Sequence, residues 1–317
     1  MTEKKKPAPA CLPALGGSRG LVLSGGGKRG VFQLAHLDET GHTFTHINGV
    51  STGILAGAMF AAGKTSQAID VYTEMANEKI YSHSPLTRKG KFSIPNIIFR
   101  LLRGKTSLGE LHRLETLIRD NFTLQDFSRV QDSGIDVSVY AHCIQRKDFP
   151  LHAWSTQDGY TDYETFVNAM VASCCFYPLG HVADVYYPGL GKTYQYVDGG
   201  HADSITITQM LRKGISDITV YILQEQTPSG AFPDVKNLVD GVGRVARGMR
   251  QYQYWNKLLE ACELAAHGTD ADQLTIRAIY LPEELSNNAM DFNADHARRY
   301  ERMGRDLELV ARHTHVY

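Results

Sequence analysis

Residues 20–30 have the sequence GLVLSGGGKRG, in which an apolar run leads into three consecutive glycines. A short apolar run of this kind is typical of a strand buried in a parallel sheet, and the following residues, 31–38, favour a helix. The stretch therefore predicts a strand, a glycine-rich loop and a helix in succession. Such a loop presents bare backbone amides at a helix N-terminus, where they bind a phosphate or stabilise an oxyanion equally well.

The glycine loop also fits a second pattern, because Gly25, Gly27 and Gly30 satisfy the G-x-G-x-x-G signature of dinucleotide-binding proteins. That interpretation requires an acidic residue about 20 residues further on, at the end of the second strand. The second predicted strand, Thr45–Val50, runs instead into a serine. The dinucleotide interpretation is therefore disfavoured, and a tight turn without any ligand stays open as a third alternative.

Residues 49–53 have the sequence GVSTG and lie between that second strand and a helix of small apolar residues. In this context G-x-S-x-G predicts a nucleophile elbow, in which Ser51 sits on a sharp, strained turn. Gly49 and Gly53 supply the small residues that the turn needs on either side. The helix that begins there directs the positive end of its dipole at the serine.

The other elements predicted along the chain alternate between strands and helices. Strands are expected at 20–24, 45–50, 135–144, 217–223 and 275–281, and helices at 31–38, 53–62, 66–80, 108–121, 163–172, 235–266 and 294–312. This alternation predicts an α/β fold with a mostly parallel central sheet flanked by helices on both faces. We expect a disordered tail over residues 1–19 and a single domain over residues 20–317.

A serine hydroxyl is a poor nucleophile without a base, so the sequence must supply one. None of the 13 histidines lies in a distinctive loop setting. Asp198 stands out instead, because it follows a strand-like stretch and precedes Gly199 and Gly200. The two glycines predict an open turn that presents the carboxylate.

The glycine loop, the Gly49-x-Ser51-x-Gly53 pattern and the Asp-Gly-Gly turn at 198–200 together resemble the motifs of the patatin-like phospholipases, a family of lipid acyl hydrolases. Residues 172–179 resemble the helix end that precedes the family's aspartate, and 291–304 resemble its closing segment. The similarity extends from about Gly20 to about Leu309. It implies a three-layer sandwich with a helical cap at about 80–106.

The resemblance also implies a set of site residues. Ser51 is the nucleophile, Asp198 is the base, and no metal or other cofactor takes part. The loop that holds the oxyanion comprises Gly25, Gly26, Gly27, Lys28, Arg29 and Gly30. Because an aspartate with an ordinary pKa of about 3.9 is a weak base for a hydroxyl, we expect Asp198 to be poorly solvated.

Two details of the site stay open. Arg29 either neutralises an oxyanion or phosphate head group, or is a solvated or salt-bridged residue at the helix start. Family members often follow Asp-Gly-Gly with Asn-x-Pro, whereas this chain continues with His201 and then Asp203. These two residues either contact the dyad or only form the turn, which we favour.

Composition limits the function classes. The 317 residues carry 33 Lys and Arg against 34 Asp and Glu, which argues against a general nucleic-acid binder. Five cysteines without a C-x-x-C pair predict free thiols in a reducing compartment. No apolar run reaches the roughly 18 residues of a membrane span, so we expect a cytoplasmic protein, at most peripheral at a membrane.

A local basic segment is a candidate membrane contact. Between Lys79 and Gly109 there are seven Lys and Arg residues and no acid. Within it, a helix spacing places Ile94, Ile97, Ile98, Leu101 and Leu102 on one face, and Arg100 and Arg103 on the opposite face. The pattern favours contact of residues 88–105 with an anionic lipid surface. The alternative is a cap helix that packs its apolar face on the body.

The motifs together predict a serine acyl hydrolase that cleaves carboxylic esters of phospholipids or lysophospholipids through an acyl-enzyme. Another lipid esterase, a thioesterase, an acyltransferase and a catalytically silent lipid-binding protein of the same fold are the alternatives. The oligomeric state is not predicted.

Overall fold

The computed structural model describes residues 18–87, 93–148, 150–226, 248–249, 252–263, 274–283, 285 and 293–317. Its strands form one nine-stranded sheet, in which successive members of the series β5-β6-β3-β2-β1-β7-β8-β9 are hydrogen-bonded to each other and β4 also pairs with β3. The strands are β1 (Arg19–Leu23), β2 (His46–Val50), β3 (Asp136–Cys143), β4 (Leu151–Ser155), β5 (Ala183–Tyr187), β6 (Lys192–Asp198), β7 (Asp217–Ile222), β8 (Thr275–Tyr280) and β9 (Thr314–Val316).

The five central strands, β3, β2, β1, β7 and β8, run parallel to one another. The remaining pairings, which involve β4, β5, β6 and β9, are antiparallel. The helices are α1 (Gly30–Thr40), α2 (Thr52–Ala61), α3 (Thr65–Glu74), α4 (Asn77–Ile80), α5 (Ile94–Leu102), α6 (His112–Asn121), α7 (Leu124–Ser133), α8 (Tyr163–Ser173), α9 (Ile207–Arg212), α11 (Ala294–Arg305) and α12 (Leu307–Arg312).

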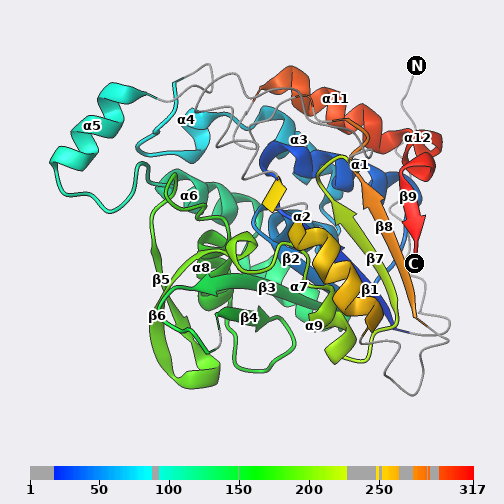
Figure 1. The fold of residues 1–317 in the computed structure, drawn as a ribbon. Coiled ribbons are helices and arrows are strands. Elements are labelled where there is room, and N and C mark those ends of the chain that lie inside the picture. Colours follow the sequence, from blue (N-terminus) through cyan, green and yellow to red (C-terminus); the bar gives the residue numbers. More distant parts are fainter. Residues whose placement is uncertain are drawn as a thin grey trace.

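Helices cover both faces of the sheet (Figure 1). Alternate side chains of β1 enter different cores: Leu21 and Leu23 pack with α1, α2 and α8, whereas Val22 packs with α9 and the helical residues 252–263. Both cores exclude water, which stabilises the sheet from either side. The predicted α/β class, with a mostly parallel sheet between helical layers, is thus confirmed.

Two predicted helices are interrupted, each for a local reason. The helix predicted over 66–80 ends at Glu74, because the carbonyl of Met75 turns aside to accept a hydrogen bond from Lys28 Nζ at 2.8 Å. The helix predicted over 294–312 breaks at Asp306, whose side chain caps α12 by accepting the N–H of Leu309 at 2.9 Å.

The boundaries of three other predictions also change. The helix predicted from residue 108 begins only at His112, because Glu110 forms a β-bridge with His83. The tail predicted over 1–19 is too long by at least two residues, since Arg19 already belongs to β1 and Ser18 is described; residues 1–17 lie outside the described residues. Most of the helix predicted over 235–266 also lies outside them, and residues 252–263 are helical.

Candidate active site

Ser51 lies on a strained turn between β2 and α2. Its φ of 55° and ψ of −135° make it the one non-glycine residue with positive φ in the described part of the chain. A Cβ at Gly49 would lie 2.4 Å from Ile54 Cα, and a Cβ at Gly53 would lie 2.2 Å from the carbonyl oxygen of Leu23. Both neighbours are backbone atoms, so the turn requires glycine on either side of the serine.

The glycine loop packs directly against this serine. A Cβ at Gly25 would come within 2.5 Å of Ser51 Cβ and 3.2 Å of Ser51 Oγ, so only a glycine fits beside the hydroxyl. Gly27 has a φ of 59°, which lets the loop turn into α1. The N–H of Gly26 donates to Thr52 Oγ1 at 3.2 Å and ties the loop to the elbow.

Groups in the second half of the glycine loop already have hydrogen-bond partners within the protein. The amide of Arg29 donates to the carbonyl of Gly26, and the amide of Gly30 to the carbonyls of Gly27 and Lys28. The side chains of Lys28 and Arg29 are buried. The Arg29 guanidinium donates to the carbonyl of Leu223 at 3.1 Å, which excludes the interpretation of Arg29 as a solvated residue.

Asp198 approaches the elbow along the same edge of β3. On that strand, Tyr140 is the partner of Val50 and the next residue, Ala141, is the partner of Asp198. Tyr140 and Ala141 both pair with β4 on the opposite edge of β3. β2 and β6 therefore pair with the same edge of β3 and meet end to end there. Ser51 and Asp198 are therefore placed at adjoining strand ends, although 146 residues of chain lie between them.

The turn after Asp198 packs on the residue before the nucleophile. Cβ atoms at Gly199 and Gly200 would lie 3.1 Å and 3.9 Å from Val50 Cγ1. One oxygen of the Asp198 carboxylate, Oδ1, accepts the N–H of Gly200 at 2.8 Å. Asp198 is only 4% exposed, as the sequence led us to expect. The carboxylate is thus buried at the strand end that adjoins the strained turn of Ser51.

Ser173 is a site residue that sequence reasoning missed. Its hydroxyl accepts the backbone N–H of Ser51 at 2.8 Å and donates to the carbonyl of Tyr140 at 2.6 Å. Ser173 is the last residue of α8 and is fully buried. No local pattern distinguishes it, because both partners lie far away in the sequence.

The residues after Ser173 lie close to Asp198, whose N–H donates to the carbonyl of Cys175 at 2.9 Å. Burial and the nearby charge of Asp198 raise the pKa of both Cys174 and Cys175, so these thiols stay protonated. They are free thiols, as predicted. The imidazole of His201 contacts the carbonyl oxygens of Asp198 and Tyr177, at 3.0 Å and 3.1 Å, and therefore holds the turn rather than the carboxylate.

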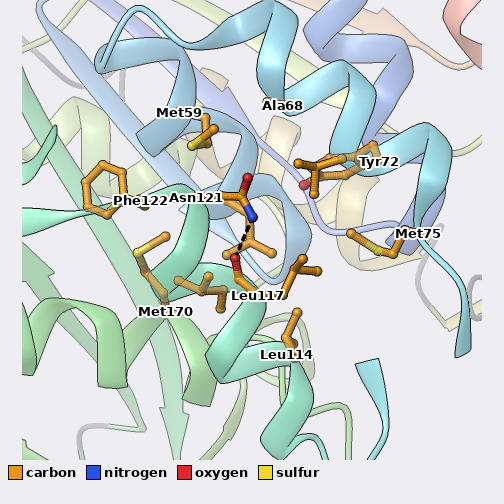
Figure 2. Close-up of a pocket in the computed structure, with 12 residues that line it drawn as sticks. Met59, Ala68, Tyr72, Met75, Leu114, Leu117, Asn121, Phe122 and Met170 are labelled. Atoms are coloured by element: carbon orange, nitrogen blue, oxygen red, sulfur yellow. Dashed lines mark hydrogen bonds between the residues drawn. The ribbon is translucent and has the colours of Figure 1, made fainter. Parts of the chain in front are cut away.

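An apolar cavity of about 40 Å³ begins one helical turn behind the elbow. Figure 2 shows its lining, which comes from α2, α3, α6 and α8: Leu55, Met59, Ala68, Val71, Tyr72, Met75, Leu114, Leu117, Ile118, Asn121, Phe122 and Met170. Tyr72 joins the cavity to the elbow, because its hydroxyl donates to the carbonyl of Thr52 at 2.5 Å. The wall is suited to hydrocarbon and not to a charged group.

Metal-binding groups and membrane-spanning helices are two further features that bear on function. In the part of the chain that the structure describes, His, Cys, Asp and Glu side chains form no group that could hold a metal ion. Among the same residues, no helix is both long and apolar enough to cross a membrane.

The fold and the strained serine define the class: an α/β protein with a strained serine turn between a strand and a helix. The family model of the patatin-like phospholipases matches residues 21–211, and the chain belongs to that family. Membership supports lipid acyl hydrolase activity in general. Among solved structures, VipD from Legionella pneumophila is similar, with 16% identity and a TM-score of 0.44 over 95% of this chain and 68% of that chain. No curated protein matches the chain.

Proposed function

We propose that the protein is a serine acyl hydrolase in which Ser51 and Asp198 form a catalytic dyad. The observation that supports the proposal is the meeting of β2 and β6 on one edge of β3, because Ser51 follows the end of β2 and the buried Asp198 ends β6. Glycine packing on both residues supports the same assignment, because neither turn would accept a side chain at Gly25 or Gly199.

The proposed reaction follows from these positions. Asp198 takes the proton of the Ser51 hydroxyl as the oxygen attacks the ester carbonyl. Amides of the glycine loop stabilise the resulting oxyanion. We propose those of Gly25 and Gly27, since the amides of Gly26, Arg29 and Gly30 already donate to other groups. The protonated Asp198 then gives its proton to the leaving alcohol, and an acyl-enzyme remains. Water activated by Asp198 releases the fatty acid and restores the serine.

We propose phospholipids or lysophospholipids as the substrate class. The lining of the cavity behind the elbow supports a hydrocarbon group on the acyl side. Ten of its twelve residues are apolar, and Tyr72 and Asn121 are the other two. A site of this kind also suits other lipid esters, thioesters or acyl transfer, which product analysis of a mixed phospholipid extract by mass spectrometry separates. The basic segment 88–105 supports peripheral contact with an anionic membrane.

A fluorophosphonate probe tests the nucleophile. We expect it to label the wild-type protein and not Ser51→Ala, and labelling that survives the substitution would place the nucleophile elsewhere. Absence of labelling and of ester turnover in the wild-type protein would favour a silent lipid-binding protein of the same fold.

A second substitution tests the base. Asp198→Asn should lower ester turnover by about 10²- to 10⁴-fold, the usual contribution of a positioned base. Asp184→Asn, an exposed aspartate on β5, is the matched control and should leave turnover unchanged. Equal turnover of Asp198→Asn and the wild-type protein would eliminate the dyad.

A further inference from the structure

Helix α5 is apolar, yet its side chains face solvent. Five of its residues are large hydrophobics with high exposed fractions: Ile94 (60%), Ile98 (50%), Phe99 (53%), Leu101 (58%) and Leu102 (83%). In Figure 1 the helix stands at the periphery of the molecule, away from the layers that cover the sheet. Single exposed apolar residues are common, whereas a contiguous group of this size marks an interaction surface.

Four of the five exposed residues, all but Phe99, form one stripe. Ile94, Ile98, Leu101 and Leu102 follow the i, i+4, i+7, i+8 spacing of a single helix face. The alternative that this face packs on the body is thereby excluded for the described residues, because the side chains that should be covered are the exposed ones.

The face of α5 that the sequence predicts to be basic is different in the structure. Arg100 does not face solvent: it is 6% exposed and donates to the carbonyl of Ser107 at 2.9 Å and to Glu110 Oε1 at 3.1 Å. It therefore anchors α5 to the segment that follows it. Arg103 carries its guanidinium 4.1 Å over the ring of Phe99, where it stands beside the apolar stripe.

The charges around the stripe indicate its partner. Arg103 directly follows the helix and is exposed. Lys105, two residues further on, has an exposed side chain that also lies 4.0 Å from Glu110 Oε1. In the sequence, residues 79–109 contain no acid. Apolar side chains bordered by cations suit the boundary between acyl chains and anionic head groups.

We propose that α5 is a bilayer-insertion helix, whose exposed stripe enters the interface of an anionic phospholipid membrane while Arg100 holds the helix in its presenting position. The proposal deepens the proposed function and rests on it in one respect: the membrane is the source of the substrate. The segment after α5 is attached to the body near the site, because Leu108 donates its N–H to the carbonyl of Pro178 at 2.8 Å and α6, which follows, lines the apolar cavity.

The first test uses vesicles of phosphatidylcholine with and without phosphatidylglycerol. In the Ser51→Ala background, which removes turnover, Leu101→Ser with Leu102→Ser should weaken co-sedimentation by about tenfold or more, since two side chains leave the interface. Leu124→Ser is the matched control, because Leu124 is 60% exposed on α7, and it should bind as the parent does. Equal binding of all three proteins would overturn the proposal.

A second test gives a gain of signal. The emission of Leu102→Trp should shift to the blue on vesicles that contain phosphatidylglycerol, whereas that of Leu124→Trp should not. Exchange of Arg103 and Lys105 for Gln should weaken binding mainly at low salt. A dimer is the competing explanation of the stripe. If the protein with leucines at 101 and 102 is a dimer, Leu101→Ser with Leu102→Ser converts it to a monomer, and neither binds vesicles, the stripe joins two copies and the proposal is wrong.

Turnover of a short-chain, water-soluble ester separates this inference from the proposed function. In a protein that retains Ser51, the same α5 substitutions should leave hydrolysis of that ester at the wild-type rate and lower activity only on vesicles. Vesicle binding that depends on α5 in a protein without any ester turnover would preserve the insertion helix and reject the hydrolase.

Discussion

The hydroxyl of Ser173 accepts the backbone N–H of Ser51 at 2.8 Å, and so connects the end of α8 to the strained turn. The same hydroxyl donates to the carbonyl of Tyr140 on β3 at 2.6 Å. One buried side chain thereby fixes the elbow against β3, the strand whose Ala141 pairs with Asp198. Because the N–H of Ser51 has this partner, the positive φ of the serine is held by a specific contact as well as by packing.

Ser173→Ala should therefore impair catalysis without removing a reacting group. The loss leaves the Ser51 N–H without its partner, which costs about 1–3 kcal/mol of folding free energy. Displacement of the nucleophile by a fraction of an ångström should lower turnover by about tenfold to a hundredfold. Steady-state kinetics and urea unfolding measure the two effects, and a variant with wild-type values in both would show that the contact is incidental.

The strain at Ser51 predicts a difference between two inactive variants. Ser51→Gly and Ser51→Ala both lack the hydroxyl, but only glycine adopts a φ of 55° without strain. Ser51→Gly should be more stable than Ser51→Ala by about 1–2 kcal/mol, the usual size of such backbone strain. Thermal or urea unfolding of the pair checks this, and an alanine variant of equal or greater stability would mean that the turn relaxes.

Local sequence patterns were sufficient to nominate Ser51 and Asp198, because each lies in a turn whose glycines are visible in the sequence. The contact between those turns was not predictable in the same way. It requires β6 to pair antiparallel with the last residues of β3, beyond the end of β2. Packing across the whole sheet determines that pairing. Ser173 lacked any signal, since its partners are 122 and 33 positions away.

The same limit explains the error at Arg100. Periodicity assigned this residue to the basic face of α5, opposite the apolar side chains, whereas the structure buries it. Glu110, ten positions along, supplies a partner for the guanidinium beyond the end of the helix. The pKa of Glu110 is held below its ordinary value mainly by the hydrogen bond and charge of Arg100, against an opposing effect of burial.

The cavity behind the elbow predicts control of acyl-chain length. Val71→Phe adds a ring to a cavity of about 40 Å³, so the space open to the far end of a chain should disappear. Hydrolysis of long-chain esters should fall by at least about tenfold relative to short-chain esters, because only long chains reach past the first turn of α2. Competition between esters of different length measures the ratio. An unchanged preference would place the acyl chain outside this cavity.

Asp203 predicts a pH-dependent contribution to stability. Burial raises its pKa from 3.8 to about 7, although Lys257, 3.9 Å away, opposes the shift. The folded state thus holds the proton more tightly than the unfolded state, so the stabilisation is complete below about pH 4 and is lost as the pH rises through about 7. Asp203→Asn, which cannot ionise, should lose less stability over that interval than the wild-type protein. Urea unfolding across the interval measures this, with the exposed Asp184→Asn as control. A wild-type profile that parallels that of Asp203→Asn would show that Asp203 is ionised throughout, with Lys257 outweighing the effect of burial.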